Sequence, residues 1–262
     1  MKIGHVAGMS VSGHYPVLVF ALAFILLSLA SKAGALLHRR YPAITTEHKD
    51  DLGIILAATL TLLALIIGFS FSMATDRYNQ RKDLEVAEAN AIGTEIRRTD
   101  LLSPQDAAKV RKLLRDYLDQ RILFYNEKGK SPRIQIAERT GRLQADLWIS
   151  ARDATGANPS PVAVLVLSGM NDVFNAQGAS QAADLNRIPV AAWLLMGSIA
   201  ICSTMLLGYR ARSSGRLAFV LPLVVSISLL LIADIDTPRH GLIHVYPENL
   251  ENLARSVGGW AQ

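Results

Sequence analysis

The sequence predicts an all-α integral membrane protein, in which four transmembrane helices flank a helical extramembrane domain. The main observation is that apolar residues gather in four long blocks, 16–37, 52–74, 188–209 and 217–233. Each block has 17 to 23 residues, and a helix that crosses the hydrocarbon core needs about 20. Charged residues make up only 19% of the chain, below the roughly 25% that is usual in soluble domains. The single cysteine excludes an internal disulfide framework.

The net charge of +5 does not require a nucleic-acid partner, because basic residues that flank membrane spans explain it. The chain has no glycine-rich phosphate loop, no Gly-x-Ser-x-Gly elbow, no Cys-x-x-Cys pair and no His-Glu-x-x-His motif. We therefore expect no nucleic-acid binding, no enzyme activity and no cofactor.

The first block, 16–37, carries one charged residue, Lys32, near its end. An alternative interpretation is a cleaved signal peptide, because the apolar run 17–30 has the length of a signal-peptide core and 31–33 resembles a cleavage site. The long segment before this run offers only one Lys or Arg, Lys2. This favours a retained transmembrane helix.

The other three blocks contain no Asp, Glu, Lys or Arg. Coupled transporters and pumps often need ionisable groups inside the membrane or interrupted helices, and Pro222 is the only helix breaker in the middle of the fourth block. A pump or a proton-driven carrier is therefore disfavoured. Cys202, in the third block, is expected to be an inert packing residue.

Residues 75–187, between the second and third blocks, form a charged region whose periodicity is helical. No breaker separates it from the second block, so one helix is expected to run from the membrane to residue 98. Ser103 and Pro104 predict the start of the next helix, which carries an apolar stripe and ends near Gly129. Further helices are expected over 133–151 and 161–175, with the apolar run 162–167 buried. The expected organisation is therefore an N-terminal part with the first two spans (1–74), the helical extramembrane domain (75–187), the last two spans (188–233) and a C-terminal tail (234–262).

Four spans place both termini and the charged region on the same side of the membrane. The Lys and Arg residues near the span ends number six on each side, so the positive-inside rule does not choose the orientation. A large charged helical region is more often cytoplasmic. We therefore expect a multi-pass protein of the cell (inner) membrane with its termini and charged region in the cytoplasm.

The end of the second block combines small, hydroxyl and aromatic residues over 68–78. Small and hydroxyl residues are common where membrane helices pack together. The alternative is a pore wall, in which hydroxyl groups favour water and a bulky apolar side chain forms a constriction. Spacing alone leaves both interpretations open.

One other feature, a pair of histidines, is a weak signal for metal. His240 and His244 are four residues apart, a spacing that places two ligands on one helical face, but Pro238 and Gly241 argue against a regular helix there. We expect solvated or interfacial histidines and no metal site.

The second block also carries a resemblance to the bestrophins, which are anion channels of animal and bacterial membranes. Gly68-Phe69 is followed at matching spacing by Asp76-Arg77-Tyr78, and 234–238 resembles the acidic stretch after the last bestrophin span. The chain is more closely similar to the bacterial bestrophin-like family of small membrane proteins, roughly from Leu52 to Val257. The segments that carry this similarity are 68–81, 88–94, 97–102, 171–174, 187–195, 208–209 and 233–245.

The resemblance implies a homo-oligomer, a pentamer in bestrophins, with the second span around a central pore. It implies a neck at Thr61, Leu65 and Phe69, in which Thr61 departs from the bulky apolar pattern. The lining and the inner mouth would include Ser70, Ser72, Met73, Arg77 and Arg81. Animal bestrophins bind calcium with an acidic cluster after the last span, but Asp234 and Asp236 are too few for that ion, which takes six to eight oxygens.

The resulting hypothesis is an anion-permeable channel for ions such as chloride. The alternative is a non-conducting scaffold or signalling protein, whose central helices bind a cytoplasmic partner through the stripe from Leu113 to Tyr125. Packing within the chain or between subunits explains this stripe equally well.

Overall fold

The computed structural model describes residues 15–40, 46–156, 160–210, 219–239 and 241–258, without the side chains of 15, 46–50 and 130. Within these ranges every regular element is helical, as the sequence predicts. The elements are α1 (Tyr15–Arg40), α2 (Thr46–Arg98), η2 (Thr99–Leu101), α3 (Pro104–Asn126), α4 (Lys130–Thr155), α5 (Pro161–Leu185), α6 (Val190–Arg210), α7 (Val220–Asp236) and α8 (Glu248–Gly258).

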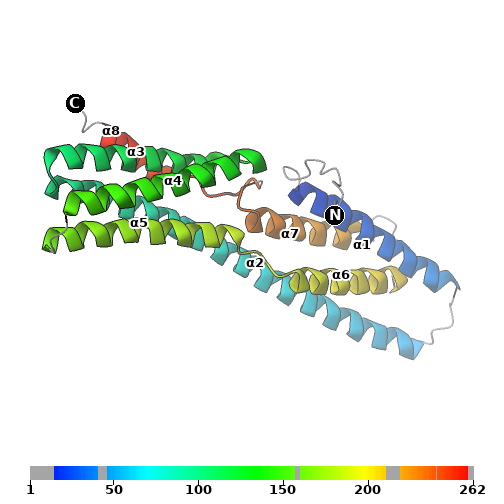
Figure 1. Ribbon diagram of the computed structural model, residues 1–262. Helices are drawn as coiled ribbons and strands as arrows, with labels where there is room; N and C mark the ends of the chain where they lie inside the picture. Colours follow the sequence, from blue (N-terminus) through cyan, green and yellow to red (C-terminus); the bar gives the residue numbers. More distant parts are fainter. Residues whose placement is uncertain (1–14, 41–45, 157–159, 211–218, 240, 259–262) are drawn as a thin grey trace, which may run out of the picture. The chain divides into compact units, whose positions relative to one another are not determined.

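The helices gather into two compact units, each built from two separate stretches of chain. The apolar unit comprises Met1–Arg77 and Arg187–His244, and the charged unit comprises Tyr78–Asn186 and Val245–Gln262. In the apolar unit α1 packs against α6 and α7. In the charged unit α3 packs against α4, and α4 against α5, as Figure 1 shows.

One helix, α2, contributes residues to both units. It runs unbroken for 53 residues, as the sequence predicts from the absence of any breaker between the second block and residue 98. Gly68 and Gly93 lie inside it without ending it, because flanking residues with good helix propensity and packing outweigh the roughly 1 kcal/mol cost of an internal glycine.

Three helical runs in the described part of the chain are long and apolar enough to cross a membrane. They are Pro16–Arg40, Asp51–Leu101 and Pro161–Arg210. The fourth predicted span starts at residue 217, and its first two residues, 217 and 218, lie outside the described residues. The helix α7 covers the rest of this span and continues to Asp236. Since α7 has 17 residues and is not among the three runs, the count of four spans stays a prediction.

The packing of α1 on α6 depends on two glycines. A Cβ atom at Gly34 would fall on the carbonyl oxygen of Met205, and one at Gly208 would fall on the carbonyl oxygen of Ser31. Each glycine therefore lets the backbone of one helix approach that of the other, which is the usual role of small residues between membrane helices.

Serine caps start two helices of the charged unit. The Ser103 hydroxyl oxygen accepts a hydrogen bond from the backbone N–H of Asp106, and that of Ser160 accepts one from the N–H of Ala163. Each serine is followed by proline at the first helical position, so the cap predicted at Ser103 is confirmed. The helix predicted over 161–175 is ten residues too short, because α5 continues through Gly178 to Leu185.

Five helices enclose the core of the charged unit. The apolar stripe of α3 supplies Val110, Leu114, Tyr117 and Leu118, all at most 1% exposed. They pack with Ile92 and Ile96 of α2, Leu147 of α4, Val166 and Met170 of α5, and Leu250 of α8. The stripe is therefore used inside the chain, where it is not available to dock a separate partner.

The apolar run 162–167 is buried on one face only, in contrast to the sequence prediction. Val166 is fully buried, whereas Val164 is 67% exposed and Leu165 is 41% exposed. The reason is that α5 packs through residues three and four apart, so a continuous run on a helix must point in every direction.

A buried ionic network joins α2, α3 and α5 beside this core. The Arg121 guanidinium binds the Glu88 carboxylate through two nitrogens, and it also donates to the Ser180 hydroxyl at 3.2 Å. Ser180 and Tyr125 donate to the same carboxylate at 3.0 Å and 3.3 Å. Burial and the Glu88 charge raise the pKa of Tyr125, so the phenol stays a donor at neutral pH.

The tail contains a helix that the sequence analysis missed. The Glu85 carboxylate accepts hydrogen bonds from the backbone N–H groups of Asn249 and Leu250, both at 3.0 Å. It thus caps the N-terminus of α8, where a negative charge is stabilising. The signal that could have found α8 is the three- and four-residue spacing of Leu250, Leu253 and Val257, which face the core.

Candidate functional site

The predicted neck residues lie on one exposed face of α2. Phe69 is 65% exposed and Leu65 is 51% exposed, and Thr61 and Ser72 are exposed on the same face of the helix. The Thr61 hydroxyl donates to the carbonyl of Ala57 at 2.9 Å, which leaves its oxygen as an acceptor toward the surface. We name this face the exposed stripe: Thr61, Leu65, Phe69 and Ser72.

The opposite face of α2 packs inside the apolar unit. Leu56, Leu63 and Ala74 are at most 8% exposed. Ser70 is only 4% exposed and lies on this packed face, so it does not share a surface with Phe69. Met73 is 38% exposed and lies beside the exposed stripe. Of the proposed lining residues after Phe69, the structure therefore groups Ser72 with the neck and places Ser70 away from it.

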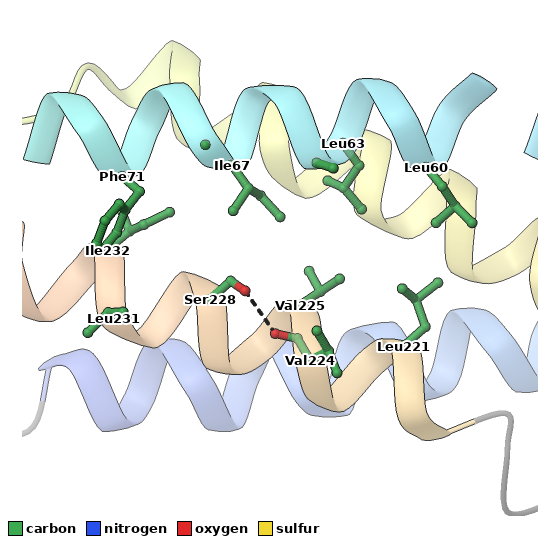
Figure 2. A pocket seen from close by; sticks show the side chains of 12 residues that line it. Leu60, Leu63, Ile67, Phe71, Leu221, Val224, Val225, Ser228, Leu231 and Ile232 are labelled. Atoms are coloured by element: carbon green, nitrogen blue, oxygen red, sulfur yellow. Dashed lines mark hydrogen bonds between the residues drawn. The ribbon is translucent and has the colours of Figure 1, made fainter. Parts of the chain in front are cut away.

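A third face of α2 borders an apolar cavity of about 410 Å³. Figure 2 shows Leu60, Ile67 and Phe71 of α2 pointing across it toward the side chains of α7. The one polar side chain from α7, Ser228, donates to the carbonyl of Val224 at 3.0 Å. Phe69 and Phe71 thus point from the same helix to different surroundings, which makes them a matched pair for experiments.

Asp236, at the end of α7, connects three segments of the apolar unit. Its carboxylate accepts from the backbone N–H of Ile188 at 3.1 Å and 3.2 Å and lies 3.5 Å from the Arg77 guanidinium. Arg187 donates to the Asp236 carbonyl at 3.2 Å. Asp236 is 6% exposed, so much of the charge of Arg77 is compensated at close range.

Asp234 folds the segment that follows α7. Its two carboxylate oxygens accept from the backbone N–H groups of Leu242 and Ile243 at 2.8 Å and 2.9 Å. A Cβ atom at Gly241 would lie 2.5 Å from the Asp234 carbonyl oxygen, so only glycine fits this close approach.

These two aspartates do not fit a calcium site. Each of their four oxygens already accepts a hydrogen bond from a backbone N–H of the chain, and two carboxylates supply too few of the six to eight oxygens that calcium takes. Of the two histidines, His240 lies outside the described residues, and His244 Nδ1 is 3.2 Å from the Gly241 carbonyl. Within the described ranges, no three His, Cys, Asp or Glu side chains cluster as metal ligands would.

The remaining predicted residue, Arg81, belongs to the charged unit. It is 6% exposed and lies on the face of α2 that also carries Glu85 and Glu88. The structure therefore does not place it on an open surface with Phe69. Lys82, the next residue, is exposed.

The same face of α2 carries a carboxyl group that titrates near neutral pH. Glu95 is fully buried, and one of its oxygens lies 3.4 Å from the Arg98 guanidinium. Burial raises its pKa to about 7, against the opposing effect of Arg98 and with a smaller contribution from Asp172.

Because the pKa of Glu95 is raised, the free energy of unfolding is expected to fall as the pH rises from about 4.5 to about 7. The folded state binds the proton more tightly than the unfolded state, so this group contributes a slope of at most about 1.4 kcal/mol per pH unit in that window. Glu95→Gln is expected to remove the slope and to be more stable than the wild type at pH 8. Thermal unfolding of both proteins in detergent between pH 5 and pH 8 measures this, and identical profiles would contradict it.

The fold and the site together define a helical membrane protein with an apolar unit, a helical charged unit and an exposed apolar stripe on the helix shared by both. A profile of the bestrophin-like domain matches residues 24–250. The chain belongs to the bestrophin-like family, as the sequence motifs predict.

Solved structures of similar fold come from the same group of proteins. Three crystal structures of a bacterial bestrophin homologue from Klebsiella pneumoniae, two of them of single-substitution variants, align with TM-scores of 0.63. Their sequences are 13–14% identical to this chain, and the alignments cover 91–94% of it and 96–98% of the homologue. At this identity the likeness shows the fold alone. A comparison with curated proteins gives no match.

Proposed function

We propose that this chain assembles into a homo-oligomeric, anion-permeable channel whose wall is the exposed stripe of α2. The observation that carries the proposal is that Leu65 and Phe69 are at least half exposed, on the face opposite the one that packs inside the apolar unit. A family resemblance to bestrophin channels supports a ring of five copies around these residues. The protein would reside in the inner membrane with its charged unit and termini in the cytoplasm.

The charges near the stripe favour small anions such as chloride. Residues 52–74 contain no acidic side chain, so the pore would lack the acidic rings that select cations. Asp76 is exposed just beyond the stripe, and Asp236 compensates Arg77. Arg77 is therefore not expected to attract anions strongly, and selectivity is expected to be weak.

Phe69→Ala is expected to raise chloride flux, because it removes a bulky apolar side chain from a constriction that excludes water. The measurement is chloride and potassium release from proteoliposomes that contain the purified full chain. Phe71→Ala is the matched control, since it removes the same side chain from the same helix but from the cavity between α2 and α7. The control is expected to keep the wild-type flux.

If both substitutions changed the chloride flux equally, the change would reflect a loss of protein stability and not the removal of a side chain from the exposed stripe. If neither the wild type nor Phe69→Ala releases chloride as a folded oligomer, the channel proposal is wrong and the alternative, a non-conducting scaffold or signalling protein, takes its place. Exposed apolar side chains on the charged unit favour that second candidate, since Ile134 and Trp148 of α4 are 54% and 38% exposed. A detergent-stable monomer would contradict the pore itself.

A further inference from the structure

A second apolar groove in the apolar unit lies between the ends of three helices. Its volume is about 490 Å³, within the roughly 300–1,000 Å³ of ligand sites. It is lined by Leu37 of α1, Leu52 of α2, and Cys202, Met205, Leu206 and Tyr209 of α6. Cys202, which the sequence analysis expects to be a packing residue, is exposed and forms part of this lining.

The inside of the groove suits a hydrocarbon chain. None of its lining residues is charged, and the α6 residues follow one another at three- and four-residue spacing along a single face. The Tyr209 ring is held edge-on against His38, with ring centroids 5.1 Å apart. The groove is thus formed by side chains that the fold positions, on helices that are long and apolar enough to cross a membrane.

The mouth of the groove is basic. Arg40 follows Leu37 by three residues and Arg210 follows Leu206 by four, so each arginine lies on the groove face of its own helix. The Arg210 guanidinium also rests on Gly53, next to Leu52. Both arginines are exposed, as is Arg39, and the one acidic side chain described at this end is the exposed Asp51.

We infer that this groove binds an anionic phospholipid, with one acyl chain along α6 and the phosphate against Arg40 and Arg210. Charge complementarity carries the assignment, because an apolar groove that opens onto an excess of arginines at the ends of membrane helices matches a lipid with a negative headgroup. Simple interfacial anchoring of arginines would neither require the groove nor distinguish headgroups. The inference does not depend on ion conduction.

The test is lipid binding to the full-length protein in detergent, followed by native mass spectrometry. The probes are phosphatidylglycerol and phosphatidylcholine with the same acyl chains. The wild type is expected to bind phosphatidylglycerol more tightly. Arg40→Gln combined with Arg210→Gln is expected to weaken that binding about thirtyfold, as two arginines near a membrane surface predict, and to leave phosphatidylcholine binding unchanged.

Two further variants separate the groove from its rim. Cys202→Phe fills the groove and is expected to weaken both lipids, whereas Arg142→Gln removes an exposed charge from α4 and is expected to weaken neither. Size exclusion and thermal unfolding verify folding, and the single arginine variants replace the double variant if it does not fold. The inference is wrong if the arginine variants keep the wild-type preference, if Cys202→Phe binds both lipids normally, or if soluble glycerol phosphate competes with the lipid.

Discussion

Glu88→Ala is expected to lower the free energy of unfolding of the charged unit by about 3–5 kcal/mol, because it leaves a buried guanidinium without its carboxylate. Arg121 is 1% exposed and its side chain cannot lose its proton at accessible pH. Its remaining contacts in the described structure include a hydrogen bond to Ser180 and the ring of Phe124, 4.1 Å from the guanidinium carbon. Neither supplies a negative charge.

Chemical denaturation of the full chain in detergent, followed by circular dichroism, measures this effect. Glu138→Ala is the matched control, because Glu138 and Arg142 form an exposed pair on α4 whose loss is expected to cost at most about 1 kcal/mol. Replacing Glu88 and Arg121 together with leucine should recover much of the stability, since an apolar pair needs no compensating charge. Equal losses for Glu88→Ala and Glu138→Ala would show that the network contributes no more than a surface pair.

Gly208→Ala is expected to destabilise the apolar unit strongly. The new methyl group would overlap the carbonyl oxygen of Ser31, and backbone atoms on two packed helices cannot rotate away as a side chain can. The loss should exceed the roughly 1–3 kcal/mol that is usual for overpacking, and it should appear as a lower melting temperature in detergent.

Gly197→Ala on the same helix is the control for this substitution. A Cβ atom at Gly197 meets no described atom within 4 Å, so alanine there is expected to be neutral or slightly stabilising through its better helix propensity. If both alanine variants melt at the same temperature, the close approach of α1 and α6 does not contribute to stability.

Local signals in the sequence predicted much of the helical structure. Ser103 followed by Pro104 identified the start of α3 because a helix cap depends on neighbouring residues only. The continuity of α2 followed from the lack of a breaker before residue 98. Gly178 was a weaker local signal, and α5 passes through it because its packed face continues to Ala183.

The parts that the sequence did not predict depend on partners far along the chain. Glu85 caps α8 from 164 residues away, and no spacing rule connects the two. Asp234 and Asp236 resembled an incomplete ligand set because their partners are backbone N–H groups, which every residue except proline carries. Ser70 and Phe69 are neighbours in sequence and point to different faces of α2, but only the packing of the helix shows that Ser70 is buried and Phe69 is exposed.

The way each unit is divided along the chain has a consequence for biosynthesis. The charged unit needs Leu250 and Val257 for its core, and the apolar unit needs Asp236 to hold the start of α6. The apolar unit is therefore incomplete until Asp236 has been synthesised, and the charged unit until Val257 has, so the usual order in which an N-terminal domain folds first is not available here. Until α8 has been synthesised, Glu85 lacks the N–H groups of Asn249 and Leu250 that it caps. Chains that terminate before α8 should therefore be substrates for chaperones and proteases rather than partly active proteins.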